Sequence, residues 1–232
     1  MAGNIVEKKT IQNIQKLFSQ VSTKDFKRRP KVQETQKQPE VLLEFRKTGQ
    51  TQIALGGRGY TLSHKDRFAQ EILAVILGGG MSSRLFMEIR EKLGLAYYIR
   101  TVSELSPDTG YLATFAGLKN ENVQKALKVI MKEYQKLAAK KVSLKELRNA
   151  KDRMKGQMAL SLESSDAKAE FYGIQEILES RFFTPEEVYD RIDKVKVSDI
   201  QRVAKNLFSK KNLNLVVLGP FKDKKDFLKI LL

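Results

Sequence analysis

The feature that most constrains the fold is a long polar segment near the N-terminus. Residues 19–40 read SQVSTKDFKRRPKVQETQKQPE, which contains two prolines and has neither helical nor strand periodicity. Connections inside one compact domain are usually about 4–6 residues long, so a structureless stretch of this length is typical of a linker between domains. We therefore predict three parts: residues 1–18, a linker at residues 19–40, and a domain at residues 41–232.

The segment before this linker has the pattern of a strand followed by a helix. The first residues, MAGNI, are typical of the end of a buried strand that leaves through a turn. Ile11, Ile14 and Leu17 then follow at helical spacing and predict a helix at Glu7–Phe18. We expect this fragment to be the tail of a domain whose beginning is absent from the chain.

Residues 41–232 have strand patterns at both ends of a block of helices. The expected strands are 41–46, 52–60, 97–104, 110–118 and 213–219. The expected helices begin after Ser63 and at residues 83, 121, 144, 165, 185 and 199. Helix starts are indicated by the capping pairs Ser63–Asp66, Ser143–Glu146, Thr184–Glu187 and Ser198–Gln201. Because the strands are mostly linked as hairpins, we predict an α+β fold with a mixed, mostly antiparallel sheet packed by helices.

The composition limits the classes of function. The chain has 43 Lys and Arg against 27 Asp and Glu, a net charge of +16, which raises the possibility of nucleic-acid binding. The basic residues are however spread over the expected helices among acidic ones, the densest run (Lys24–Lys31) lies in the linker, and there is no tryptophan. We therefore interpret the charge as solvated helix faces, and keep a basic nucleic-acid-binding protein as a third hypothesis. No apolar run is long enough to span a membrane.

The stretch LGGGMSSRLFMEIREKLGLAYY (Leu77 to Tyr98) resembles a phosphate-binding loop at first sight. A P-loop would need a Gly-Lys-Ser/Thr sequence after a strand, whereas these glycines follow an expected helix and no lysine precedes the serines. We predict that Gly78–Gly80 end one helix through a left-handed residue and that Ser82 or Ser83 caps the next. That second helix should stop at Gly94.

The sequence contains few residues that could be ligands of a metal ion. The chain has no cysteine and one histidine, His64, which we place just inside a helix start with a surface or capping role. A catalytic zinc needs about three protein ligands and an open position. We therefore expect no metal and no cofactor in this chain.

Two blocks of the sequence are similar to a known family. SHKDRFAQEILAVILGGGMSSRLFMEIREKLGLAYYI and the tail VSDIQRVAKNLF…LNLVVLG resemble the pitrilysin/insulinase zinc peptidases, with the mitochondrial-processing-peptidase-like bacterial members closest in pattern. In that family two homologous α+β halves, joined by a linker, face one another, and the N-terminal half carries a His-x-x-Glu-His zinc motif. The resemblance implies that residues 1–18 end such a half and that residues 41–232 form the C-terminal half without zinc. Zinc is then expected in the partner half.

The same resemblance implies two site residues. The family's C-terminal half supplies an arginine and a tyrosine seven residues apart, and REKLGLAY places Arg90 and Tyr97 at these positions. They are implied to contact a peptide substrate near the scissile bond. Strand alternation sends Tyr98 to the face opposite Tyr97. We expect Ser82, Ser83 and Arg84 to serve the helix start and domain packing instead.

These observations lead to a first and a second hypothesis. The first hypothesis is that the chain is the C-terminal half of a zinc endopeptidase and is inactive without a zinc-bearing half. That half would be encoded in the same gene or lie on another chain. The alternative is a noncatalytic structural or assembly subunit of the same family. Retention of Arg90 and Tyr97 favours the first hypothesis. Homo- or heterodimers fit either, and we slightly favour a cytoplasmic location because no signal peptide is recognisable.

Overall fold

A five-stranded sheet organises the computed structural model, which describes residues 1–22, 30–179 and 181–232. Its strands are β1 (Glu40–Phe45), β2 (Gln50–Arg58), β3 (Ala96–Leu105), β4 (Gly110–Lys119) and β5 (Leu213–Gly219). Their order across the sheet is β1-β5-β2-β4-β3. The β1–β5 pair is parallel and the other pairs are antiparallel. The predicted α+β class with a mixed, mostly antiparallel sheet is therefore confirmed.

The order of the strands corrects one expectation. β1 and β2 follow each other closely in sequence, as in the hairpins expected for most of the strands, but β5 lies between them. Val41 pairs with Leu215, and Leu215 pairs in turn with Leu55. The strand that comes last in the chain is apolar on alternate positions and buried there, so a central place in the sheet satisfies its backbone on both sides.

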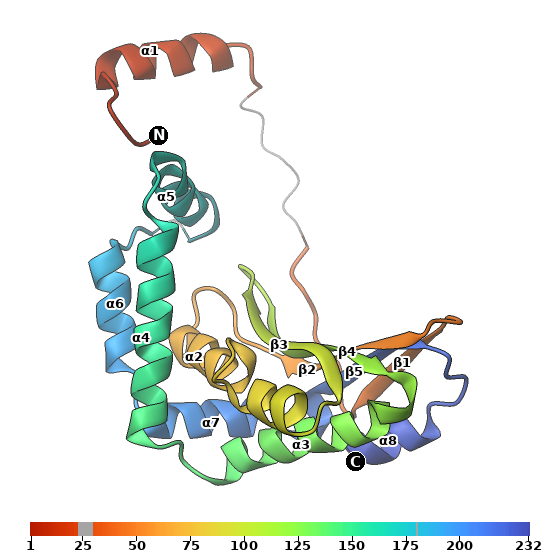
Figure 1. Ribbon diagram of the computed structural model, residues 1–232. Helices are drawn as coiled ribbons and strands as arrows, with labels where there is room; N and C mark the ends of the chain where they lie inside the picture. Colours follow the sequence, from red (N-terminus) through yellow and green to blue (C-terminus); the bar gives the residue numbers. More distant parts are fainter. Residues whose placement is uncertain (23–29, 180) are drawn as a thin grey trace.

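Helices cover one face of this sheet (Figure 1). The helical elements are α1 (Glu7–Phe18), α2 (Arg67–Gly78), η1 (Phe86–Lys92), η2 (Asn120–Asn122), α3 (Val123–Ala139), α4 (Leu144–Ser161), α5 (Ser165–Glu179), α6 (Pro185–Lys194), α7 (Val197–Leu207), η3 (Lys210–Asn212) and α8 (Lys225–Leu231). Contacts with the sheet come from α2, η1, α3, α7, η3 and α8, and the core is built mainly from the apolar sides of the helices and the strand residues beneath. A polar group in this core, the Tyr134 hydroxyl, donates to the carbonyl of Leu55 at 2.9 Å.

No helix of residues 1–22, 30–179 and 181–232 covers the other face of the sheet (Figure 1). Its strand positions alternate with the buried ones and are partly or largely exposed. We call the following set the open face: Glu40, Leu42, Glu44, Gln50, Gln52, Ala54, Arg58, Tyr98, Arg100, Val102, Glu104, Tyr111, Ala113, Phe115, Lys119, Asn214, Val216 and Leu218. Its charged residues lie mostly near the strand ends, and an apolar middle without a covering layer is unusual in a domain with one core.

The second half of the predicted linker crosses one end of this face. Glu34 pairs with Arg58 of β2 at 3.4 Å, and the Gln36 side chain accepts from Asn214 of β5 at 3.0 Å. Val32 donates to Asp108 in the turn between β3 and β4 at 3.2 Å. Residues 30–39 are thus bound to the sheet, whereas residues 23–29, with most of the basic Lys24–Lys31 run, lie outside the described part of the chain.

The N-terminal segment differs partly from the prediction. Helix α1 has the expected bounds, Glu7–Phe18, but none of its residues is buried, and it lies apart from the sheet in Figure 1. The expected buried strand at MAGNI is wrong, because residues 1–6 form no strand and Met1 and Ile5 are exposed. No strand of the described residues lies beside this segment to pair with it.

Two helix caps agree with the sequence and two do not. Ser143 accepts from the amide of Glu146 at 3.1 Å, and Thr184 forms a complete capping box with Glu187. Ser63 does not cap α2, which begins after Asp66. Ser198 lies inside α7, where the Asp199 carboxylate accepts from the Lys196 amide at 2.9 Å instead.

The glycine stretch ends a helix as predicted, but not through a left-handed residue. Helix α2 ends at Gly78 with Gly79 at its C-cap, and none of Gly78–Gly80 adopts positive φ. A Cβ at Gly78 would lie 2.4 Å from the backbone nitrogen of Thr101, which shows that this position lets α2 approach β3 closely.

Helix α8 was not predicted, although Phe227 and Leu231 on its inner side are buried.

Among the helices of the described residues, none is long and apolar enough to cross a membrane.

Candidate functional site

The predicted site residues lie on either side of a tight turn at Gly94. Gly94 has φ +59°, a left-handed conformation that favours glycine, so it is the helix-ending residue expected from the sequence. After this turn the amide of Leu95 donates to the carbonyl of Ile89 at 2.9 Å. Helix η1 also packs against β3. These interactions fix the segment that carries Arg90 to the strand that carries Tyr97.

The helix that carries Arg90 is a π-helix and not the α-helix that we predicted. The amide of Leu93 donates to the carbonyl of Glu88, five residues back, at 3.2 Å. Such wide turns are rare and occur frequently at functional sites. Nothing in the residue pattern of FMEIREK distinguishes a π-helix from an α-helix, so the sequence offered no signal for this feature.

Tyr97 lies at a bulge in β3. Ala96 pairs with Leu118 and Tyr98 pairs with Gly117, so Tyr97 is an extra residue without a partner across the ladder. A bulge re-aims the side chain that it contains, and bulges are common beside active sites. The side chains of Tyr97 and Tyr98 are both well exposed, at 49% and 41%.

Arg90 and Tyr97 are free to bind a ligand. Arg90 is exposed, and its guanidinium carbon lies 5.1 Å from the centroid of the Phe86 ring. Within residues 1–22, 30–179 and 181–232, Arg90 forms no ion pair and the Tyr97 hydroxyl no hydrogen bond. A guanidinium on an aromatic face keeps its five donors available for a carbonyl or a carboxylate.

Tyr98 is held on the open face. Its hydroxyl donates to Oε1 of Gln52 at 2.7 Å. Its ring lies over Gly117, where an added Cβ would come within 2.7 Å of the ring. The sequence analysis missed Gln52 and Gly117, because their part in this contact depends on the β2–β4–β3 pairing.

Arg84, which lies just before η1, connects this segment to helices α4 and α3. It forms a bidentate pair with Glu146 of α4, Nε to Oε1 at 2.6 Å and Nη2 to Oε2 at 2.8 Å, and it lies 3.7 Å from Glu133 of α3. These hydrogen bonds raise the pKa of Arg84 further above its usual value. The expected packing role of Arg84 is therefore confirmed.

Ser83 also serves packing, although not as a helix cap. Its hydroxyl donates to the carbonyl of Gly80 at 2.5 Å, and its side chain is buried. Helix η1 has Leu85 at its N-cap and no side-chain cap, so the prediction that Ser82 or Ser83 caps it is wrong.

Comparison with known proteins identifies the family. Residues 1–154 match the family described as the peptidase M16 inactive domain. The chain belongs to the peptidase M16 family. The resemblance to the pitrilysin/insulinase peptidases is thereby confirmed.

Curated and solved relatives of this M16 domain are longer proteins. It is 30% identical over 220 residues to the uncharacterized zinc protease YmxG of Bacillus subtilis, covering 95% of this chain and 53% of that protein. It is 33% identical over 187 residues to an uncharacterized zinc protease of Mycobacterium leprae, covering 81% of this chain and 42% of that protein. A protease from Helicobacter pylori is 25% identical with a TM-score of 0.83, over 94% of this chain and 54% of that one. The chain thus spans about half the length of the relatives that it matches.

A further solved relative supports the fold. The M16 inactive domain from Pseudomonas fluorescens has a TM-score of 0.74 at 20% identity, over 84% of this chain and 47% of that one. At this identity the likeness concerns the fold alone.

His64 has a structural position in the M16 domain. It lies in the turn before α2, and not inside the helix as predicted; its ring stacks on Tyr60 with centroids 4.0 Å apart. Its Nδ1 accepts from the amide of Asp66 at 3.1 Å. In the described part of the chain, no three His, Cys, Asp or Glu side chains are grouped to hold a metal ion. The residues present therefore do not fit a zinc site.

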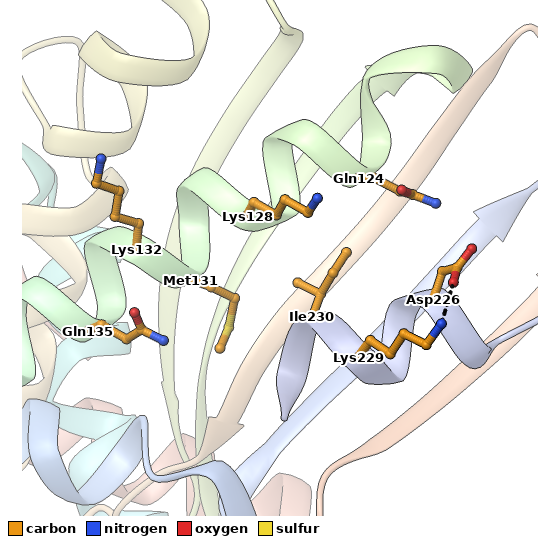
Figure 2. Close-up of a pocket in the computed structure, with 8 residues that line it drawn as sticks. All are labelled: Gln124, Lys128, Met131, Lys132, Gln135, Asp226, Lys229 and Ile230. Atoms are coloured by element: carbon orange, nitrogen blue, oxygen red, sulfur yellow. Dashed lines mark hydrogen bonds and ion pairs between the residues drawn. The ribbon is translucent and has the colours of Figure 1, made fainter.

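A groove of about 470 Å³ in the M16 domain lies between α3 and α8 (Figure 2), and neither Arg90 nor Tyr97 is among the residues that line it. Met131 and Ile230 lie in this groove, and Lys128 and Lys132 border it. Its one acidic residue, Asp226, pairs with Lys229 at 3.4 Å. The groove therefore offers no free carboxylate for acid–base chemistry, and its lysines form a solvated helix face.

Proposed function

We propose that this M16 domain is the C-terminal, non-metal half of a zinc endopeptidase and forms one wall of its peptide-binding chamber. One observation carries the proposal. A π-helix, which is a rare backbone feature, and a β-bulge lie on either side of Gly94 and carry the free Arg90 and Tyr97. A domain that served only as packing would have no need for two irregular segments beside unpaired polar side chains.

The two side chains have chemistry suited to peptide hydrolysis. When water attacks a peptide carbonyl, negative charge develops on the carbonyl oxygen, and a phenol such as Tyr97 can donate a hydrogen bond to it. The Arg90 guanidinium can hold a neighbouring carbonyl with directional donors and so fix the peptide in position. This chain then binds and orients the substrate, and the metal lies in the partner half.

In this proposal the open face of the sheet forms part of the wall of the peptide-binding chamber. It continues from the bulge at Tyr97 through Tyr98 and across the remaining strands. Residues 30–39 close one of its ends, which leaves the rows next to Tyr98 accessible. A surface of this kind fits an extended peptide.

The division of the chain belongs to the same proposal. Residues 1–18 would belong to the zinc-bearing half, residues 19–40 would form the linker, and residues 41–232 would form the second half. The exposed apolar side of α1, with Leu17 78% exposed, supports this division, because no residue of this helix is buried by the described part of the chain.

Reconstitution tests the proposal. The purified chain is mixed with a polypeptide from the same genome that carries a His-x-x-Glu-His motif, and cleavage of an internally quenched peptide is followed. We expect no cleavage by the chain alone, no stoichiometric zinc bound to it, and cleavage by the mixture well above that of the zinc-bearing half alone. Tight binding of one zinc per chain, or hydrolysis by the chain alone, would contradict the proposal. A mixture that forms a stable complex without peptidase activity would indicate the noncatalytic subunit instead.

A further inference from the structure

Arg100 is an isolated positive charge on the open face. It pairs across the sheet with Phe115, and the same row continues through Ala54, Val216 and Leu42. All four of these neighbours are apolar. The row lies one step from the Tyr98 row and is not crossed by residues 30–39, whose contacts are with Arg58, Asn214 and the β3–β4 turn.

The Arg100 guanidinium lies beside the ring of Phe115. Its carbon is 5.7 Å from the centroid of that ring, within the range of a cation–π contact. Such a contact uses none of the hydrogen-bond donors of the group, so they stay available to a ligand.

No acidic side chain of the described residues neutralises Arg100. On its own strand and face the nearest acidic residue is Glu104, four residues along, which corresponds to about 13 Å. The flanking positions on the same face are Tyr98 and Val102, and the diagonal positions on β4 are Ala113 and Gly117. An unpaired guanidinium beside apolar side chains is suited to a carboxylate, which it can bind through two hydrogen bonds.

We propose that Arg100 forms a specificity subsite that selects an acidic side chain of the peptide substrate. This inference rests on the proposed function, because it takes the open face as the chamber wall. Arg100 is three residues from Tyr97 along β3, or about 10 Å, so the selected side chain lies about three residues of an extended peptide from the scissile bond. The net charge of +16 supports the same substrate class, because it attracts acidic peptides to the chain.

The test compares matched peptides on the reconstituted pair. A series of internally quenched peptides carries Glu, Gln or Lys at each position in turn, with the ends blocked. We expect kcat/KM to be about tenfold higher for Glu than for Gln at one position, mainly through KM, because a charge-assisted hydrogen bond is lost with Gln. A peptide with a free C-terminal carboxylate at that position shows whether a chain end can replace the side chain.

Substitutions link this preference to Arg100. Arg100→Ala should reduce the Glu/Gln ratio to about one, Arg100→Lys should leave an intermediate ratio, and Arg100→Glu should favour the Lys peptide. Lys128→Ala, on the outer face of α3, is the control and should keep the ratio of the wild type. A Glu/Gln ratio that is about one in the wild type, or unchanged in Arg100→Ala, overturns the inference.

Direct binding separates this inference from the proposed function. The Glu and Gln peptides are titrated into the full chain without a partner, and binding is followed by NMR shifts of the β3 amides. Arg100-dependent preference for the Glu peptide supports the subsite even where the reconstituted pair proves inactive, in which case the endopeptidase proposal alone fails. Activity of the pair without any acidic preference overturns the subsite alone.

Discussion

Glu71 should make the stability of this domain depend on pH in the neutral range. It lies on α2 one turn after Arg67, whose guanidinium is already paired with Glu179 at 2.5 Å and bonded to the carbonyl of Leu62 at 2.7 Å. Burial raises the pKa of Glu71 from its usual 4.5 to about 7; the nearby Arg67 charge opposes the shift, and Glu179 adds to it. Glu71 is therefore protonated in the folded state under conditions in which the unfolded chain has lost this proton.

The sign and size of the effect follow from proton linkage. Between pH 4.5 and about 7 the folded state binds more protons at Glu71 than the unfolded state, so the free energy of unfolding falls as pH rises through this window and is constant above it. Each pKa unit corresponds to about 1.4 kcal/mol, and partial solvent access at Glu71 reduces the effect, so the loss by pH 8 is about 2–3 kcal/mol. Glu71→Gln keeps the shape of the side chain without its charge and should remove this loss.

Urea unfolding followed by circular dichroism measures the difference. At about pH 8 the Glu71→Gln variant should be more stable than the wild type by about 2 kcal/mol, and the gain should vanish near pH 4.5. Glu163→Gln, at an exposed position, is the matched control and should stay within about 0.5 kcal/mol of the wild type at every pH. A gain from Glu71→Gln that does not change between these two pH values would refute the reasoning.

Three further changes test the geometry around the site. Gly94→Ala should destabilise the domain by about 1–2 kcal/mol in urea unfolding, because alanine is strained at φ +59°; no loss would mean that the turn relaxes. Gly117→Val should displace the Tyr98 ring and break its bond to Gln52, lowering the thermal midpoint and shifting the Tyr98 ring resonances in NMR spectra, and unchanged resonances would contradict the packing. Thr184→Ala should cost about 1 kcal/mol in unfolding free energy through loss of the α6 capping box, whereas Thr48→Ala at an exposed loop should cost much less.

Much of the fold could be predicted because local chemistry determines it. Helix α1 has the expected bounds, helix α5 begins at the expected residue, and the Thr184 capping box depends on four consecutive residues. Strand positions on β2 and β4 follow from alternation of apolar residues. These features require no knowledge of distant parts of the chain.

The features that sequence reasoning missed depend on distant partners. The insertion of β5 between β1 and β2 brings together residues more than a hundred positions apart. The sequence of a strand does not indicate which other strand pairs with it. Gly78 was interpreted by its conformational freedom, whereas its small size matters because Thr101 of β3 lies against it. Helix α8 is short and rich in lysine. Its buried apolar residues, Phe227 and Leu231, are too few to predict a helix from their spacing.

The site was predicted in part. The family resemblance pointed to Arg90 and Tyr97, and the structure shows both exposed beside the Gly94 turn. The π-helix and the bulge were not predicted. Each adds one residue, to a helical turn or to a strand, and the types of the residues do not indicate this addition. Arg100 was not singled out, because its isolation depends on the apolar row that the neighbouring strands supply.

The catalytic effect of Tyr97 is the most direct test of the account. In the chain reconstituted with a zinc-bearing half, kcat for a quenched peptide is measured for Tyr97→Phe, with Arg90→Ala in parallel and Lys92→Ala and Tyr172→Phe as controls on η1 and α5. Loss of a hydrogen bond to the developing oxyanion should lower kcat about 100-fold in Tyr97→Phe, and loss of a substrate contact should raise KM in Arg90→Ala. The controls should match the wild type. An active pair in which Tyr97→Phe and Arg90→Ala also match the wild type would contradict the central claim.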